Sequence, residues 1–341
     1  METEEGKQQE RNESLSPNMR VVTSPALQED ILAISPEFDG TLTQEMYDQI
    51  CTQKNDKVLS NSDLYKLAAD LLTYQYNLYG VEGEHPYHDI EHSSGVTALA
   101  KNVVGILKRR ANPINDADAQ IFILAAVAHD LGHCGRTLRQ FDPETGEKLT
   151  IDDGRSNEQQ AVFLADPILK KEGFSIRQRL HFQSLILATT FDERQPNAIP
   201  DEEKFPPQTH EERLMSIIDL GDGALMEDEV EFLDRTMKVL FAEKPQAKWP
   251  RNMTHWLQTM NGFWKFVEMR MKGADGEIIP EAEALFGEVF RTRKKMFAML
   301  TSEDPSTKAE AERQFEELLS AAHAKFQPYF EKLKTAEPDA S

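Results

Sequence analysis

Cysteine is scarce in this sequence, which has only Cys51 and Cys134 among 341 residues. Two cysteines cannot build the disulfide framework of a small secreted domain, and they fit a reducing compartment. Long apolar runs are also missing: no stretch reaches the roughly 18 residues that a membrane-spanning helix needs. The N-terminus lacks the apolar segment of a secretory signal. We therefore expect a cytoplasmic protein without a membrane span.

Positive charge is in short supply as well. The chain has 38 Lys and Arg against 59 Asp and Glu, which gives a formal net charge of −21. Because both require clustered positive charge, this balance argues against a broad surface for an anionic membrane or for a nucleic-acid polymer, and we expect no nucleic-acid polymer as a partner. A small anionic substrate stays possible, because bound divalent cations can reverse the local field. The sequence leaves the oligomeric state open.

Polar residues dominate the first part of the chain, and residues 1–38 are predicted to be a disordered acidic and polar tail. From there on, apolar residues recur at helical spacing, as in Leu42, Met46 and Ile50. No convincing alternating strand is found. We predict one all-α, compact multi-helix domain over residues 39–333 and a frayed C-terminus over residues 334–341.

The most informative stretch is an apolar run, Ala125–Ala128, that leads directly into His129 and Asp130, with His133 four residues after the first His. Such a run favours a buried helix that delivers ligands to a pocket. Imidazole and carboxylate together suit Zn, Fe, Mn and similar divalent ions. His129 and His133 would share a face if the helix continues. The His-Asp pair alone would equally fit a helix end with its Asp in water.

A second group of histidines lies earlier in the chain. His85, His88 and His92 share eight residues with two carboxylates, and Pro86 favours a helix start after it. In such a helix His88 and His92 would lie one turn apart on the same face. Chance is a poor explanation for this clustering, although His85 alone is better read as a surface residue.

Further along, a helix predicted over His210–Leu220 has an apolar face and delivers Asp219 at its end. An Asp in that position is usually exposed or caps the helix, but it can also be a ligand. Glu158 follows a helix-start signal, Ser156-Asn157, and Thr189 ends a second apolar run.

Taken in order, these motifs resemble a known family. His88-Asp89-x-x-His92, His129-Asp130-Leu131-Gly132-His133, Glu158, Leu187-Ala188-Thr189 and Asp219 are similar to the catalytic core of class I cyclic nucleotide phosphodiesterases. That family belongs to the HD-domain metal phosphohydrolases, and the resemblance covers roughly residues 60 to 300. It implies an all-α domain with a central metal pocket.

The resemblance implies four ligands of a first metal ion, typically zinc: His92, His129, Asp130 and Asp219. Asp130 would bridge to a second ion, typically magnesium or manganese. Three more residues would surround that second ion: His133, Glu158 and Thr189. His88 would be the general acid that protonates the leaving O3′, with Glu158 as the group that orients it. The implied reaction is hydrolysis of a 3′,5′-cyclic nucleotide (cAMP and/or cGMP) to the 5′-monophosphate by a metal-bridged hydroxide.

For substrate binding, Asn261-Gly262-Phe263 resembles the segment that clamps the purine, with Phe263 as the clamp. This alignment places Met260 where the family has a Gln that reads the purine edge, and Asn261 is adjacent. Thr189 completes the candidate substrate-binding set. The chain also has Asp89 where the family usually has Asn.

Other functions remain open at this point. The same metal core could hydrolyse another nucleotide or phosphoester. A di-iron HD oxygenase would use similar ligands, although Glu158 and Thr189 favour a hydrated, harder ion than iron. A non-catalytic module that kept the HD fold is the third alternative.

Overall fold

The computed structural model describes residues 22–53, 55–79, 87–133, 139–141, 148–150, 156–190, 207, 209–243, 249–250, 253–273 and 276–336. The predictions for residues 1–21 and 337–341 lie outside these described residues.

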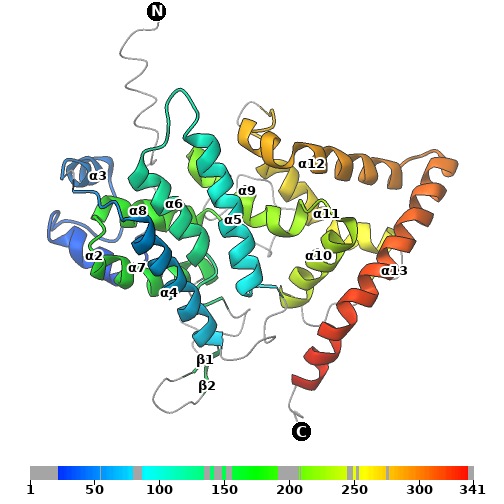
Figure 1. Ribbon diagram of the computed structural model, residues 1–341, viewed down its shortest axis with the longest axis horizontal. Helices are drawn as coiled ribbons and strands as arrows, with labels where there is room; N and C mark the ends of the chain where they lie inside the picture. The colour runs from blue at the N-terminus through cyan, green and yellow to red at the C-terminus, as the bar shows by residue number, and fades with distance from the viewer. Residues whose placement is uncertain are drawn as a thin grey trace, which may run out of the picture.

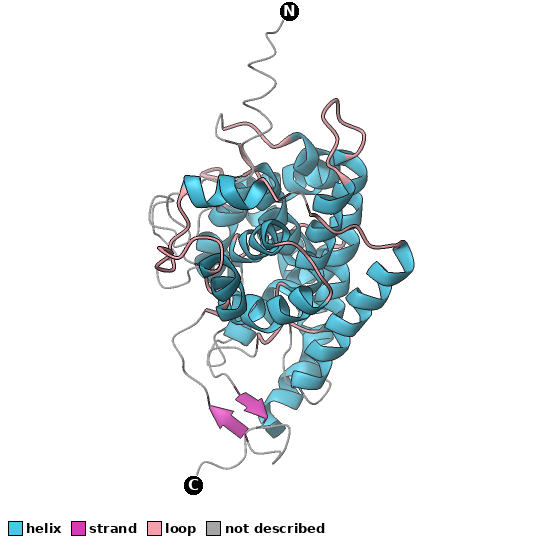
Figure 2. Ribbon diagram, turned by 90° about the vertical axis from the view of Figure 1, so that its left-hand side faces the viewer, coloured by secondary structure: helices cyan, strands magenta, loops and turns pink. Residues whose placement is uncertain are grey.

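The helices are α2 (Pro25–Leu32), α3 (Gln44–Cys51), α4 (Asn61–Tyr79), α5 (Ile90–Leu107), α6 (Asp116–Ala128), α7 (Asn157–Lys171), α8 (Ile176–Leu187), α9 (His210–Ala224), α10 (Glu229–Glu243), α11 (Met253–Arg270), α12 (Pro280–Leu300) and α13 (Pro305–Ala336). The prediction of an all-α protein is confirmed (Figures 1 and 2). One small difference is an antiparallel pair of three-residue strands, β1 (Arg139–Phe141) and β2 (Lys148–Thr150), with Arg139 opposite Thr150. The sequence shows no convincing alternating strand there. No described helix combines the length and the apolar character that crossing a membrane demands.

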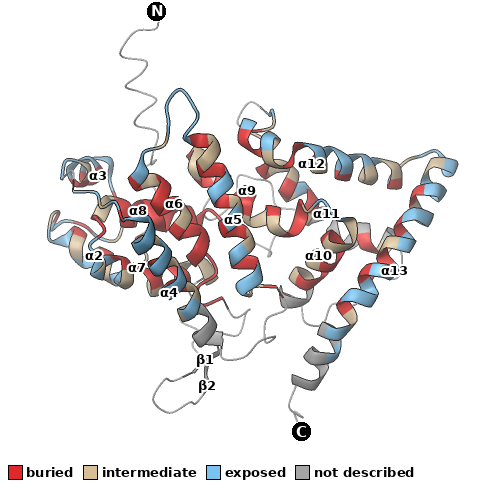
Figure 3. Ribbon diagram, in the orientation of Figure 1, coloured by how far each residue is buried: buried red, intermediate tan, exposed pale blue. Residues whose placement is uncertain are grey.

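Helix α6 occupies the centre of the main core. Nearly all of its residues from Ala119 onward are buried, including Ile121, Phe122 and Leu124 at 0% exposure (Figure 3). A helix that is apolar on every side is stable only when other helices surround it, and α4, α5 and α8 pack against α6. His129 directly follows this helix, so a helix buried in the main core positions the His-Asp pair.

A second core lies at the C-terminal side of the molecule, where α10 packs on α13 and α12 leads into α13 (Figure 1). Trp256 is fully buried there, and its ring contacts those of Phe232, Phe297 and Phe315 at centroid distances of 4.9–6.0 Å. Because the two cores share partly buried residues such as Phe263, α10–α13 pack onto the helices around α6.

The predicted disordered tail is too long at its C-terminal end. Residues 22–38 are folded: Val22, Leu27 and Ile31 are fully buried in a third apolar cluster that also includes Leu180 of α8. The physical reason is that α2 has its own apolar face and a Ser24 N-cap, which the polar average of residues 1–38 hides.

A buried ion pair between α7 and α8 also contacts α2. Arg179 of α8 donates from Nε and Nη2 to both carboxylate oxygens of Asp166 on α7, each at 2.7 Å. Its Nη1 contacts Asp30 of α2, and the Ser24 hydroxyl donates to Asp166 at 2.5 Å. Asp166 and Arg179 are 1% and 2% exposed, so the bidentate pair lies out of reach of water.

Candidate functional site

The predicted ligand residues come from distant segments and meet between three helices. His92 lies in the first turn of α5, His129 and Asp130 directly follow α6, and Asp219 lies on α9. Helices α5, α6 and α9 all pack against one another. The structure thus brings together residues that are 37 and 90 positions apart in the sequence.

Four donor atoms converge in the first cluster. Nε2 of His92 and Nε2 of His129 are 3.1 Å apart. Asp219 Oδ1 lies 3.2 Å from each of these nitrogens, and Asp130 Oδ2 lies 3.3 Å from His92 and 3.2 Å from His129. Donors bound to one zinc ion at about 2.0–2.1 Å and tetrahedral angles would be about 3.3 Å apart. The observed spacing therefore fits one divalent cation.

The hydrogen-bond partners of the two rings indicate where their protons lie. Nδ1 of His129 faces the carbonyl oxygen of Ala126 at 2.9 Å, and Nδ1 of His92 faces Asp222 Oδ2 at 2.9 Å. Both partners can only accept, so each Nδ1 donates. The Nε2 atoms are then lone-pair donors that face each other, which is repulsive unless positive charge lies between them. This is the arrangement that metal-ligating imidazoles adopt.

The electrostatics of the cluster also favour a cation. Burial disfavours the protonated form of His129, but the carboxylates of Asp130 and Asp219 outweigh it and raise its pKa to about 10. Burial likewise opposes ionisation of Asp219, yet the two histidines prevail and lower its pKa to about 2. The site therefore attracts positive charge, whether as protons or as a metal ion.

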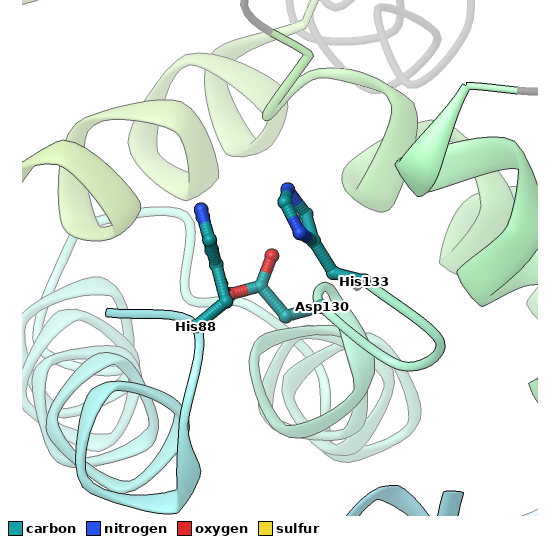
Figure 4. Close-up of side chains that lie close together, drawn as sticks. All are labelled: His88, Asp130 and His133. Atoms are coloured by element: carbon teal, nitrogen blue, oxygen red, sulfur yellow. The ribbon is translucent and has the colours of Figure 1, made fainter. Parts of the chain in front are cut away.

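A second cluster shares Asp130. Nδ1 of His88 lies 2.9 Å from Asp130 Oδ2, and the rings of His88 and His133 stack with centroids 3.6 Å apart. Figure 4 shows the two rings side by side with the carboxylate at their base. Asn157 Nδ2 donates to Nε2 of His133 at 2.9 Å. His88, Asp130 and His133 have the donor types and the proximity for a second cation.

Two expectations about helical faces differ from the structure. Helix α6 ends at Ala128, and Gly132 at φ 85° turns the chain, so His133 joins the second cluster while His129 joins the first. A Cβ at position 132 would lie 2.7 Å from Leu164, so this turn needs glycine. His88 precedes the N-cap of α5 and does not share a helical face with His92.

Asp89 has a local structural role that accounts for its residue type. It is the N-cap of α5, and its Oδ1 accepts from the backbone N–H of His92 at 2.9 Å. Asn and Asp cap helices about equally well, so the Asp in place of the family's Asn preserves the helix start.

Glu158 and Thr189 lie at the starts and ends of neighbouring helices. Glu158 follows the Ser156 N-cap of α7, and its removal from water, together with the charges of Asp130 and Asp219, raises its pKa. The buried Thr189 hydroxyl donates to the carbonyl of Ile186 at 2.8 Å. The carboxylate shown beside the ring of His88 is that of Asp130, and the orienting role of Glu158 stays a prediction.

The candidates for substrate binding on α11 differ in how much of their surroundings the structure describes. Phe263 on α11 is partly buried and packs against both cores, the position expected of a structural residue. Met260 and Asn261 also belong to α11, and their side chains lie outside the described part of the structure. The purine-clamp assignment stays a prediction.

Sequence reasoning missed Asp222 and Tyr87. Asp222 lies one turn after Asp219 on α9 and holds the ring of His92, and this i, i+3 spacing of two carboxylates was the available signal. Its Oδ1 packs so closely over Gly95 that a Cβ there would lie 1.9 Å away. Tyr87 is buried with its ring 4.4 Å from that of His92, and burial raises the pKa of its hydroxyl.

Asp222→Asn should weaken divalent metal binding about tenfold, the lower end of the range for groups that orient a metal-ligating His. The amide oxygen still accepts from His92 Nδ1, but it lacks the charge that makes the imidazole a stronger donor. Competition with a chromophoric chelator measures the affinity. Unchanged affinity in the folded variant would remove Asp222 from the site.

In a comparison with protein-family models, residues 89–222 match the HD domain. No curated protein and no solved structure matches the chain. The match begins at the N-cap of α5 and ends at Asp222, so it encloses all the residues of the first metal cluster. HD domains are typically metal-dependent hydrolases, and the two His/Asp clusters have the composition to bind metal. This match over residues 89–222 supports a place in the superfamily of HD-domain metal phosphohydrolases.

Proposed function

We propose that this protein is a metal-dependent phosphodiesterase that hydrolyses a 3′,5′-cyclic nucleotide to the 5′-monophosphate. The main support is one observation: four lone-pair donors from His92, His129, Asp130 and Asp219 converge at 3.1–3.3 Å beside a fifth residue, His88, that contacts the same Asp130 oxygen. A metal site flanked by an imidazole provides both functions that phosphodiester hydrolysis requires.

These requirements follow from the substrate. A phosphodiester is an anion that repels hydroxide, and the alkoxide it releases is strongly basic. Zinc with magnesium or manganese, when bound, would neutralise the phosphate and lower the pKa of water toward neutrality. His92, His129, Asp130 and Asp219 would hold the first ion. Asp130, between the two clusters, would also contact the second.

The orientation of His88 suits a general acid. Its Nδ1 faces Asp130, which can only accept, so Nδ1 donates there and Nε2 lies at the opposite edge of the ring. Before the reaction His88 carries a proton on each ring nitrogen. The water gives up one proton to the solvent, its oxygen bonds to phosphorus, and the P–O3′ bond breaks. The proton on Nε2 of His88 passes to O3′ and neutralises the departing alkoxide.

A substrate panel on metal-replete protein tests the proposal. Hydrolysis of cAMP or cGMP with the 5′-monophosphate as the product supports the proposal. Turnover of bis-p-nitrophenyl phosphate without either cyclic nucleotide would show a phosphohydrolase of another ester and overturn the cyclic-nucleotide assignment. Metal analysis of the same sample separates zinc with magnesium or manganese from a di-iron centre.

His88→Gln should lower kcat for a cyclic nucleotide by about 10²–10⁴-fold, the usual contribution of a general acid. The loss should be far smaller with bis-p-nitrophenyl phosphate, because p-nitrophenolate leaves without protonation. The ion held by His92, His129, Asp130 and Asp219 should stay bound. His181→Gln is a matched control, since His181 is also buried near a carboxylate, Asp118, but lies outside the site. Equal losses on both substrates would refute the acid role.

A further inference from the structure

We propose that Arg235, on α10 and outside the residues that match the HD domain, is a positioning residue for the metal site, acting through Asp222 on His92. The inference rests on the proposed function in one respect: it requires that His92 binds a metal ion. It assigns to the C-terminal helices a part in the chemistry of the HD domain.

The Asp222 carboxylate lies between the ring of His92 and the guanidinium of Arg235. Its Oδ2 lies 2.9 Å from Nδ1 of His92 and 3.5 Å from Nη1 of Arg235, so one oxygen faces both the ligand ring and the guanidinium. Its Oδ1 packs against Gly95 of α5. The Asp222 side chain is 11% exposed, so its charge is stabilised mainly by these protein contacts.

Arg235 is itself held by carboxylates of α10 and α5. Its Nε donates to Glu231 Oε1 at 3.0 Å, and its Nη2 lies 3.7 Å from a carboxylate oxygen of Glu91 on α5. Glu231 in turn pairs with Lys325 of α13. The rigid, permanently charged fork of a guanidinium can serve several carboxylates at once, which an ammonium group does less well. Arg235 on α10 thus contacts α5 and α9, and its partner Glu231 links this group to α13.

Loss of the Arg235 guanidinium would affect the metal site through Asp222. Three carboxylates, from Asp222, Glu231 and Glu91, converge on this one guanidinium. Without it they would repel one another, and Asp222 would turn away from Nδ1 of His92. The imidazole would then lose the partner that fixes its tautomer and its ring orientation, so Nε2 would no longer be held toward the other ligands.

The test measures metal affinity, with Zn²⁺ and Mn²⁺ themselves as probes, in full-length Arg235→Met and Arg235→Lys. We expect about tenfold weaker binding in the Met variant and about threefold in the Lys variant, which keeps the charge but loses the fork. Arg313→Met is the matched control, because Arg313 also pairs with glutamates on a helix but lies exposed on α13. Its affinity should equal that of the wild type.

A double-mutant cycle with Asp222→Asn separates positioning from a general loss of structure. If Arg235 acts through Asp222, Arg235→Met should cost less than about twofold in the Asp222→Asn background. The absorption spectrum of the Co²⁺-substituted protein should change in Arg235→Met and not in Arg313→Met. Equal losses in both backgrounds would overturn the proposal, as would unchanged affinity in folded Arg235→Met. If Arg235→Met does not fold, Arg235→Lys decides the question, because unchanged affinity there overturns the proposal too.

These outcomes are distinct from failure of the proposed function. A wild-type chain that binds neither ion would overturn the metal site and, with it, the role of Arg235. Tight metal binding without turnover of any cyclic nucleotide would overturn only the assigned reaction, since the affinity measurements do not depend on the substrate.

Discussion

Asp219→Asn should give a folded protein that has lost most of its bound metal and nearly all of its hydrolytic activity. The Oδ1 atom of Asp219 lies 3.2 Å from the Nε2 atoms of both His92 and His129, so it is central to the first cluster. The substitution removes one of the two carboxylate charges and leaves a neutral amide. We expect the affinity to fall by more than about 100-fold, beyond the range for groups that only support a ligand.

The measurement is metal content per chain after desalting, together with kcat on whichever substrate the wild type turns over. Asp116→Asn is the control, because Asp116 is the first residue of α6, at the end opposite to His129, and its side chain is 70% exposed. It should keep both metal and activity. Full metal content in folded Asp219→Asn would remove Asp219 from the ligands.

Asp166→Ala should lower the free energy of unfolding by about 3 kcal/mol, the lower end of the cost of breaking a buried ion pair, because Arg179 keeps its contact with Asp30. Arg179 would keep its charge at 2% exposure after losing both hydrogen bonds to Asp166. The Ser24 hydroxyl would lose its acceptor as well. Because Ser24 caps α2, the substitution should also destabilise the third apolar cluster, which contains Leu27 and Ile31 of α2.

Urea unfolding followed by circular dichroism gives the change in stability, and limited proteolysis reports whether α2 detaches. Glu310→Ala is a matched control: Arg313 forms a bidentate pair with Glu310 too, through Nε at 3.1 Å and Nη2 at 2.8 Å, but on the exposed surface of α13. That variant should unfold almost like the wild type, since exposed ion pairs contribute little. A similar loss in both variants would mean that burial is not what gives the Asp166 pair its importance.

The parts of the site that were predictable are those with local signals. The apolar run before His129 predicted a buried helix, and α6 is one. N-cap residues such as Ser156 predict helix starts from the residue type alone. The positions of His129, Asp130 and Asp219 in one cluster followed from a family resemblance, because no periodicity reveals that α6 and α9 meet.

What escaped prediction depends on contacts between distant residues. Asp166 and Arg179 look like ordinary charged positions on two helices until the fold buries them against α2. Gly132 reveals its left-handed turn only through its φ of 85°, and that turn separates His133 from His129. Asp222 was overlooked because a carboxylate that serves a ligand carries no motif of its own.

The ligands come from α5, from α9 and from the residues directly after α6, and this separation has a thermodynamic consequence. An unfolded chain would have no comparable pocket, since His92 and Asp219 are 127 positions apart. An ion that binds only the native state stabilises it by mass action, by about 2.7 kcal/mol when its free concentration is 100 times the dissociation constant. The same ion would therefore act as a folding ligand as well as a cofactor, and depletion of the metal would shift the folding equilibrium of the whole domain.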